Sequence, residues 1–301
     1  MIEPLTPEWF EKRRTIITST NVGSIMYAVE HDLWEGPPPR NSDFTAYQLK
    51  HQLIEEPESN PFMQAGRDYE FALIEKYRKK WQMTADECGL IVHPEEGWAG
   101  GTPDALLVTP AGVRVAVEAK WVHHYKASEW LDGGFPMAFY YQAMWHAFVS
   151  GSQWFALIAE IGGFDYREYL FRVNQDDLDR VVGICKGWWE RHVRDEKPPP
   201  YVPTRLHAKS IRIAANDDEE PVEPSPELDA VIESYLELHG HVEAAKEQME
   251  ILQGDIKYQM GPSTTLVNDL VKIIFRENKR GQRTFRHYLR NHKRRKNEQS
   301  D

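Results

Sequence analysis

Acidic and basic side chains with the spacing of a hydrolytic site lie within residues 102–120 of this chain. The stretch reads TPDALLVTPAGVRVAVEAK and carries Asp104, Glu118 and Lys120. Two carboxylates, with the backbone carbonyl of Ala119 between Glu118 and Lys120, offer the oxygen ligands that Mg²⁺ prefers. An adjacent lysine can orient or help deprotonate a water molecule, while a metal stabilises charge developing on a phosphodiester. The residue types are therefore compatible with metal-dependent phosphodiester hydrolysis, although so short a pattern more often has a structural origin. The alternative is a turn aspartate followed by a solvated strand face.

A β-hairpin is expected to position these side chains. Two apolar runs flank a turn cluster that contains Pro110 and Gly112, and this pattern is typical of a hairpin. The runs are residues 105–108 and 113–117. A three-residue loop with Gly112 left-handed would place Asp104 across from Glu118, whereas a two-residue turn would place it across from Val117. We predict the three-residue loop, because it gathers both carboxylates and the ammonium group at one spot.

Further motifs follow a recognisable order along the chain. In sequence they are Trp9 with Arg13, Ile17-Thr18-Ser19-Thr20, Gly66-Arg67-Asp68-Tyr69-Glu70, the trio Asp104, Glu118 and Lys120, and Tyr141-Gln142. This order resembles the PD-(D/E)xK nuclease superfamily and, within it, the YqaJ-like viral recombinase family, also known as the phage lambda exonuclease family. The resemblance covers roughly residues 5 to 205. The chain departs from the family pattern in having Ser19-Thr20 for Ala-Ser and PDA for PDG.

The resemblance implies a fold and an activity. The fold would be an α/β PD-(D/E)xK (restriction-endonuclease-like) core, with a small mixed sheet flanked by helices. The activity would be hydrolysis of double-stranded DNA from its ends, 5′ to 3′, leaving a 3′ strand for a phage-type single-strand annealing protein. Two Mg²⁺ ions are implied, with Mn²⁺ as a substitute, and relatives form a ring-shaped homotrimer. Asp104 would bridge the two ions, Glu118 and the Ala119 carbonyl would complete the first site, and Lys120 would position the attacking water.

The predicted helix over residues 66–81 contributes one more carboxylate. Glu70, Ile74, Tyr77 and Trp81 recur at helical spacing and share one face. A carboxylate on an apolar face is costly without a partner. The resemblance implies that Glu70 serves the second metal ion or its water. A nearby lysine or arginine, or solvent, is the structural alternative.

A second helix, over residues 137–149, is apolar on nearly all sides and should be buried. Gln142 and His146 are its polar exceptions. A buried amide needs hydrogen-bond partners. The resemblance implies that Gln142 supports Lys120, and satisfaction by the backbone is the alternative.

An anion site is expected near the start of the chain. Thr6 and Pro7 mark a helix start, and Thr18 to Thr20 precede a second helix. Hydroxyls and free N–H groups at a helix start bind anions, and an arginine beside them can hold a phosphate bidentately. The resemblance implies that Arg13, Thr18 and Thr20 grip the 5′-phosphate of a DNA end. A capped helix with surface arginines is the alternative.

Composition indicates an ordinary globular protein. Hydrophobic residues make up 41% and charged residues 28% of the 301, and no apolar run approaches the ~20 residues that span a bilayer. We expect a cytoplasmic protein without membrane association. The two cysteines, Cys88 and Cys185, should be reduced and partly buried. Two cysteines also exclude nuclease relatives that hold a four-cysteine iron–sulfur cluster.

Charge is distributed unevenly over the predicted parts. The net charge is −11, but residues 271–301 carry 11 Lys and Arg against 3 Asp and Glu, hence +8, which leaves −19 elsewhere. A DNA-binding protein normally shows a basic face, so the total charge argues mildly against one. We predict a nuclease domain over 1–213, an acidic Pro-rich linker over 214–227, and an appendage over 228–301. The appendage would comprise an amphipathic helix with about four heptads, a short β-hairpin and a basic tail.

Additional strands are expected at residues 90–92, as the first strand of the sheet, and at 154–161 and 168–173, as a hairpin beyond the core. Two other function classes remain open. The chain could be a non-catalytic module that binds DNA ends or recruits a recombination partner, or a structure-specific endonuclease on the same core. The presence of Asp104, Glu118 and Lys120 argues against the first, and Arg13 beside the threonines argues for end binding over internal cutting.

Overall fold

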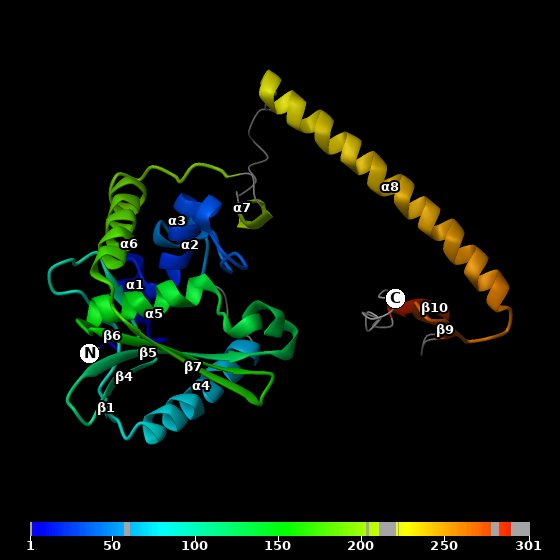
Figure 1. Ribbon diagram of the computed structural model, residues 1–301. Coiled ribbons are helices and arrows are strands. Elements are labelled where there is room, and N and C mark those ends of the chain that lie inside the picture. Colours follow the sequence, from blue (N-terminus) through cyan, green and yellow to red (C-terminus); the bar gives the residue numbers. More distant parts are fainter. Residues whose placement is uncertain are drawn as a thin grey trace, which may run out of the picture. The chain divides into compact units, whose positions relative to one another are not determined.

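The computed structural model describes residues 2–56, 61–202, 205–210, 221, 223–277 and 283–289 (Figure 1). The chain divides into two compact units, Met1–Ala215 and Asn216–Asp301, and each is described by itself. Most of the predicted linker, and the predicted basic tail beyond residue 289, lie outside the described residues.

A five-stranded mixed sheet forms the centre of the first unit. The strands, in spatial order, are β1 (Thr84–Asp86), β4 (Ala105–Val108), β5 (Arg114–Val122), β6 (Trp154–Ile161) and β7 (Asp165–Arg172). β5 and β6 are parallel, and the other neighbours are antiparallel. Helix α5 (Met137–Ser150) lies between β5 and β6 in the chain and provides the crossover that parallel strands require.

Helices cover both faces of this sheet (Figure 1). On one face, Leu73 and Tyr77 of α4 (Pro61–Lys80) pack against Val115, Val117 and other alternate residues of the strands. On the other face lies α5, with α2 (Ser19–Glu30) and α6 (Gln175–Trp188) packed against it. The fold class expected from the sequence, a small mixed sheet flanked by helices, is therefore confirmed.

The helix starts follow the capping residues in the sequence. The Thr6 hydroxyl accepts from Trp9 N at 3.3 Å and caps α1 (Pro7–Arg14), and Thr18 with Asn21 forms a capping box at α2. Both predicted starts are confirmed, whereas α4 begins at Pro61, earlier than the predicted residue 66. The remaining helical segments of this unit are η1 (His31–Leu33), α3 (Asp43–Lys50), η2 (His124–Gly133), η3 (Trp189–Arg194) and α7 (Arg205–Ser210).

Two strand predictions were wrong in their placement. Residues 91–92 form β2 (Ile91–Val92), which pairs with β3 (Gly100–Gly101) in a separate two-stranded sheet. The first strand of the central sheet is instead β1, whose Thr-Ala-Asp sequence lies at an edge and has no apolar signal. β6 and β7 do not lie beyond the core, because residues 155–159 of β6 are fully buried between both helical layers. Period-two patterns cannot show which strand becomes central.

The β3 glycines bring the start of α2 against the sheet region. Gly100 N donates to Ile17 O at 2.9 Å, and Ile17 N donates to Trp98 O at 2.6 Å. A Cβ at Gly100 would lie 2.5 Å from Ile16 Cδ1 and 2.7 Å from Ile91 O. A side chain at residue 100 would therefore separate the segment that carries Thr18 from the strands that carry the candidate site.

The second unit contains one long helix and a small sheet. Helix α8 (Pro226–Met260) starts with Ser225, whose hydroxyl accepts from Leu228 N at 3.3 Å. The strands β8 (Thr265–Val267), β9 (Val271–Glu277) and β10 (Arg283–Leu289) form an antiparallel sheet with β9 in the middle. The helix and strands expected in this region are thus present. Within the described residues, no helix combines the length and apolar character needed to cross a bilayer.

Candidate active site

The hairpin that carries the candidate residues has the predicted loop. Ala105 pairs with Val117 and Val108 pairs with Arg114, and Thr109 N donates to Val113 O at 2.9 Å. Three residues, 110–112, remain between the strands, and the last of them, Gly112, has φ +79°. The prediction of a three-residue loop is therefore confirmed.

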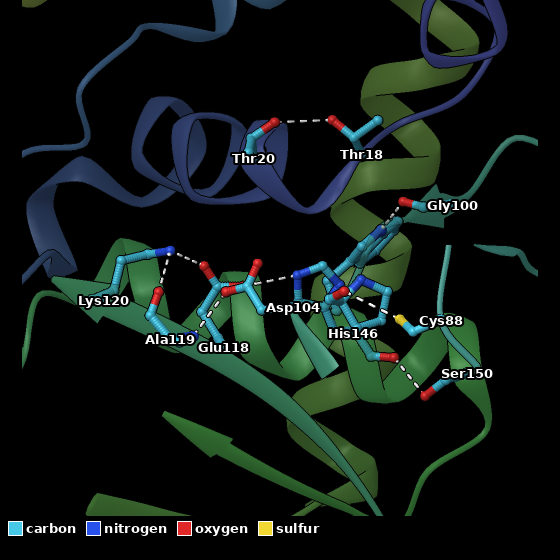
Figure 2. A network of polar contacts seen from close by, with 12 residues as sticks. Thr18, Thr20, Cys88, Gly100, Asp104, Glu118, Ala119, Lys120, His146 and Ser150 are labelled. Atoms are coloured by element: carbon cyan, nitrogen blue, oxygen red, sulfur yellow. Dashed lines mark hydrogen bonds and ion pairs between the residues drawn. The ribbon is translucent and has the colours of Figure 1, made fainter. Parts of the chain in front are cut away.

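Asp104 occupies the open side of β5, where the hairpin pairing ends. Its N–H donates to Val117 O at 3.1 Å, and its Oδ2 accepts from Ala119 N at 2.8 Å. β4 begins at Ala105, whereas the pairing of β5 with β6 continues to Val122. Beyond Val117, β5 therefore has a strand neighbour on one side only. The Asp104 carboxylate fills part of the other side, next to Glu118 (Figure 2).

Lys120 lies beside Glu118 on the same side of β5. Its Nζ donates to Glu118 Oε1 and, at 3.1 Å, to the carbonyl oxygen of Ala119 (Figure 2). The ammonium also lies 5.3 Å from the ring centroid of Phe139 on α5. A positive group thus sits between the carboxylate and the carbonyl that the sequence reasoning assigned to a metal ion.

His146 of α5 holds the other oxygen of Glu118. The distance from His146 Nε2 to Glu118 Oε2 is 2.9 Å, and both side chains are 0% exposed. Sequence reasoning assigned His146 no role. The available signal was its position as one of two polar residues in an otherwise apolar helix.

Burial and charge shift the ionisation of this cluster in a consistent direction. Burial, together with the charge of Glu118, raises the pKa of Asp104 well above its usual value. Burial by itself would raise the pKa of Glu118, but Lys120 and His146 outweigh it, and that pKa is lowered. Burial would lower the pKa of Lys120, but the carboxylates around it raise that pKa above its ordinary value. The protein alone therefore shifts Asp104 toward its protonated form, and shifts Glu118 and Lys120 toward their charged forms.

Glu70 approaches the cluster from α4. Burial raises its pKa, Lys120 opposes that shift and Glu118 adds to it, so the carboxylate is within electrostatic reach of both. Its neighbour Tyr69 stacks on Trp121 of β5, with ring centroids 4.9 Å apart. However, no three His, Cys, Asp or Glu side chains among the described residues converge closely enough to hold a metal. The two-ion arrangement expected from three carboxylates is thus not preformed in the protein.

Gln142 lies on the face of α5 that borders the site, but the structure does not join it to Lys120. It lies three residues after Phe139 and four before His146, which places all three on one side of the helix. Both flanking residues contact the Glu118–Lys120 pair. In the part of the chain that the structure describes, no hydrogen bond joins Gln142 to the lysine.

The residues predicted to bind a phosphate lie together. Arg13 Nη2 donates to Thr20 Oγ1 at 3.3 Å, and the Thr18 and Thr20 hydroxyls are 3.0 Å apart (Figure 2). The Arg13 guanidinium lies 4.2 Å from the ring centroid of Trp9. Trp9 Nε1 in turn donates to Thr102 Oγ1 at 3.0 Å. Arg13, Thr18 and Thr20 form a basic cluster. Because Thr102 lies two residues before Asp104, the Trp9–Thr102 hydrogen bond connects this basic cluster to the carboxylates of Asp104 and Glu118.

Lys50 belongs to the same basic cluster, and sequence reasoning missed it. Its Nζ donates to the carbonyl oxygen of Arg13 at 2.6 Å. Burial, with a further contribution from the charge of Arg13, lowers the pKa of Lys50 to about 7. Two neighbouring cations repel each other, and an anion bound between them would relieve that repulsion. No spacing in the sequence relates residue 50 to residue 13.

The oxygens at the centre of the site fit a hard divalent cation. Glu118 Oε1 and the Ala119 carbonyl already coordinate one positive group, the Lys120 ammonium. The Asp104 carboxyl beside them would ionise more readily if a cation compensated its charge, since ligand deprotonation and metal binding are coupled. All three groups are oxygen donors of the kind that Mg²⁺ and Mn²⁺ accept.

The two cysteines have no part in this chemistry. Both are free, as expected, and Cys185 is buried. The Cys88 thiol donates to the Pro103 carbonyl at 3.1 Å, and burial raises the pKa of this thiol to about 11.

The fold and site together define a class. A mixed sheet flanked by helices presents Asp, Glu and Lys from one hairpin in the PD…ExK order, as in PD-(D/E)xK proteins. A family model, the YqaJ-like viral recombinase domain, matches residues 8–153. This segment of the chain is thus a YqaJ-like viral recombinase domain, which confirms the resemblance found in the sequence.

Structures of one solved exonuclease share the fold of this chain. The alkaline exonuclease LHK-Exo from Laribacter hongkongensis matches with 19% identity and a TM-score of 0.51, over 63% of this chain and 94% of that one, and its complex with dAMP matches equally. A phage-related exonuclease from Haemophilus somnus 129PT matches with 9% identity and a TM-score of 0.41, over 60% of this chain and 96% of that one. No curated protein matches this chain.

Proposed function

We propose that this protein is a Mg²⁺-dependent DNA exonuclease that degrades one strand of a duplex from its 5′ end and leaves a 3′ single strand for phage-type homologous recombination. The observation that carries the proposal is the convergence of Asp104, Glu118, the Ala119 carbonyl and Lys120 on the open side of β5. The YqaJ-like domain and the similarity of the fold to that of the alkaline exonuclease LHK-Exo support it.

Each residue at the centre has a proposed task. Asp104, Glu118 and the Ala119 carbonyl would hold the cation, which stabilises charge on the attacking and leaving oxygens when bound. Lys120 would exchange its contact with Glu118 Oε1 for a contact with the attacking water, and would orient that water toward the phosphorus. Gln142, on the adjacent face of α5, would restrain the lysine.

Glu70 and the basic cluster would serve the substrate around that centre. Glu70 would hold a second cation or its water, since it already lies within electrostatic reach of Glu118 and Lys120. Arg13, Thr18 and Thr20 would bind the 5′-phosphate of the strand end. The Trp9–Thr102 hydrogen bond would then fix the distance between the end of the strand and the phosphodiester that is cut.

A digestion of linear duplex DNA tests the proposed function. With Mg²⁺ or Mn²⁺, a 5′-end label should be released as a mononucleotide at once, whereas a 3′-end label on the same strand should remain on the polymer until late. A chelator should stop both releases. A covalently closed circular duplex should stay intact, and cutting it would favour the endonuclease alternative. Binding of duplex ends without any release would favour a non-catalytic end-binding module.

Arg13→Ala should selectively reduce the use of 5′-phosphorylated ends. A guanidinium–phosphate contact is worth about 1.5–3 kcal/mol, or roughly 10- to 100-fold. We expect the variant to degrade 5′-phosphate and 5′-hydroxyl duplexes at similar rates, with wild type preferring the phosphate. Arg14→Ala is the matched control, because Arg14 is paired with Glu11 at the end of the same helix. An undiminished phosphate preference in Arg13→Ala would reject the phosphate site.

The organisation of the rest of the chain is also proposed. The nuclease domain would occupy residues 1–213, joined by a linker at 214–227 to the unit with α8 and the small sheet. A single-strand annealing protein would be the partner in recombination, and assembly as a homotrimer follows from the family resemblance. Size measurement in solution, with and without residues 214–301, would test whether the second unit contributes to assembly.

A further inference from the structure

His146 contacts Glu118 at the most deeply buried point of the site. The imidazole and the carboxylate are both 0% exposed and meet at 2.9 Å through Nε2 and Oε2. The glycines of β3 make room for the ring, because a Cβ at Gly101 would lie 3.2 Å from His146 Nδ1. Trp145, the residue before it, donates Nε1–H to Gly100 O at 3.0 Å and fixes α5 against the same strand.

The environment of the ring selects one tautomer. His146 Nδ1 is buried and has no hydrogen-bond partner within the described residues. A proton on Nδ1 would therefore be a buried donor without an acceptor, which is unfavourable. A proton on Nε2 instead meets an oxygen of the Glu118 carboxylate. The geometry thus assigns the donor role to Nε2, whose N–H points at the carboxylate.

Because of this hydrogen bond, the two carboxylate oxygens of Glu118 have different partners. Oε2 is held by His146, so Oε1 is left facing the Ala119 carbonyl and the Lys120 ammonium (Figure 2). A residue that hydrogen-bonds to a metal-ligating side chain fixes the orientation of that side chain. Loss of such a residue typically weakens metal binding 10- to 100-fold.

We propose that His146 is a positioning residue of the cation site: its Nε2–H fixes Glu118 so that Oε1 and the Ala119 carbonyl converge on the cation. The proposal rests on the function proposed above and assigns a role to a residue outside the PD…ExK motif. His146 touches neither substrate nor cation and acts through Glu118.

Two substitutions separate this role from simple packing. The amide nitrogen of Gln lies as many bonds from the backbone as Nε2, whereas that of Asn matches Nδ1. His146→Gln can therefore still donate to Glu118, and His146→Asn cannot. Both are neutral and polar, and the larger cavity that Asn leaves at this buried position is measured separately, as a loss of thermal stability without metal. Thermal unfolding of the metal-free variants would show which are folded.

Binding of Mn²⁺ to metal-free protein, measured from the EPR signal of free Mn²⁺, tests the proposal without turnover. We expect about 10- to 100-fold weaker binding for His146→Asn and less than about tenfold for His146→Gln. Glu118→Gln should remove the site. Equal affinity of wild type and His146→Asn, with binding lost in Glu118→Gln, would overturn the positioning role alone. Absence of Mn²⁺ binding in wild type would overturn this role together with the proposed function.

A spectroscopic readout covers the case in which His146→Asn does not fold. In ¹⁵N-histidine NMR spectra of the wild type, with the His146 signals assigned by their loss in His146→Gln, we expect a proton on Nε2. A ring protonated at Nδ1 alone would overturn the proposal, because Nε2 would then have no proton to donate to Glu118.

Discussion

Glu118→Gln and Lys120→Ala are each expected to reduce the digestion of linear duplex by about a hundredfold to a thousandfold. Removing one preorganised electrostatic group from an active site costs on the order of 10²–10³ in turnover. Glu118 is the ionised oxygen ligand at the centre of the cluster, and Lys120 is its adjacent cation. Binding to duplex ends should persist, because the basic cluster around Arg13 is unchanged. Initial rates of nucleotide release, and gel-shift affinities for the same duplex, would measure the two effects.

Matched exposed residues control for the change in charge. Glu11→Gln and Lys79→Ala remove the same groups from side chains that are 68% and 72% exposed and paired within their own helices. Both controls should digest DNA at the wild-type rate. Wild-type digestion by Glu118→Gln or Lys120→Ala would reject the assignment of the chemistry to this hairpin.

Asp104→Asn should make the metal-free protein more stable above neutral pH while abolishing its activity. The native pKa of Asp104 is raised above its unfolded value by burial and by Glu118, so the fold favours the protonated carboxyl. The contribution of Asp104 to the free energy of unfolding is therefore greatest at pH values below its pKa in the unfolded state. That contribution is lost as pH rises through its pKa in the native state. Asparagine keeps the shape without the charge.

Urea unfolding in a chelator, repeated from acid to alkaline pH, would measure this effect. The wild type should lose stability relative to Asp104→Asn as pH rises, and added Mn²⁺ should remove or reverse the difference, because only the wild type retains both carboxylate ligands. Asp68→Asn, on the exposed side of α4, is the control and should follow the wild type. Parallel pH curves for wild type and Asp104→Asn would contradict a raised native pKa at Asp104.

The sequence alone determined the hairpin and the side chains that it brings together. The three-residue loop needs a left-handed backbone conformation at its last position, and Gly112 adopts that conformation readily. This local constraint sets the register that brings Asp104 next to Glu118. Capping residues likewise set the starts of α1 and α2. Such signals act between residues close in the chain, so they could be predicted from spacing.

Only the tertiary structure decided which residues support that hairpin. His146 reaches Glu118 because α5 packs against β5, and Lys50 reaches Arg13 because α3 packs against α1. The same holds for β6, which became a central strand through parallel pairing with β5 across the α5 crossover. Glu70 was predicted to be a metal ligand. The fold brings its carboxylate within electrostatic reach of Glu118 and Lys120. Among the described residues, however, it does not complete a group of three side chains that could hold a metal. Periodicity in a sequence specifies which face of an element is buried, whereas partners across the fold are set by packing of whole elements.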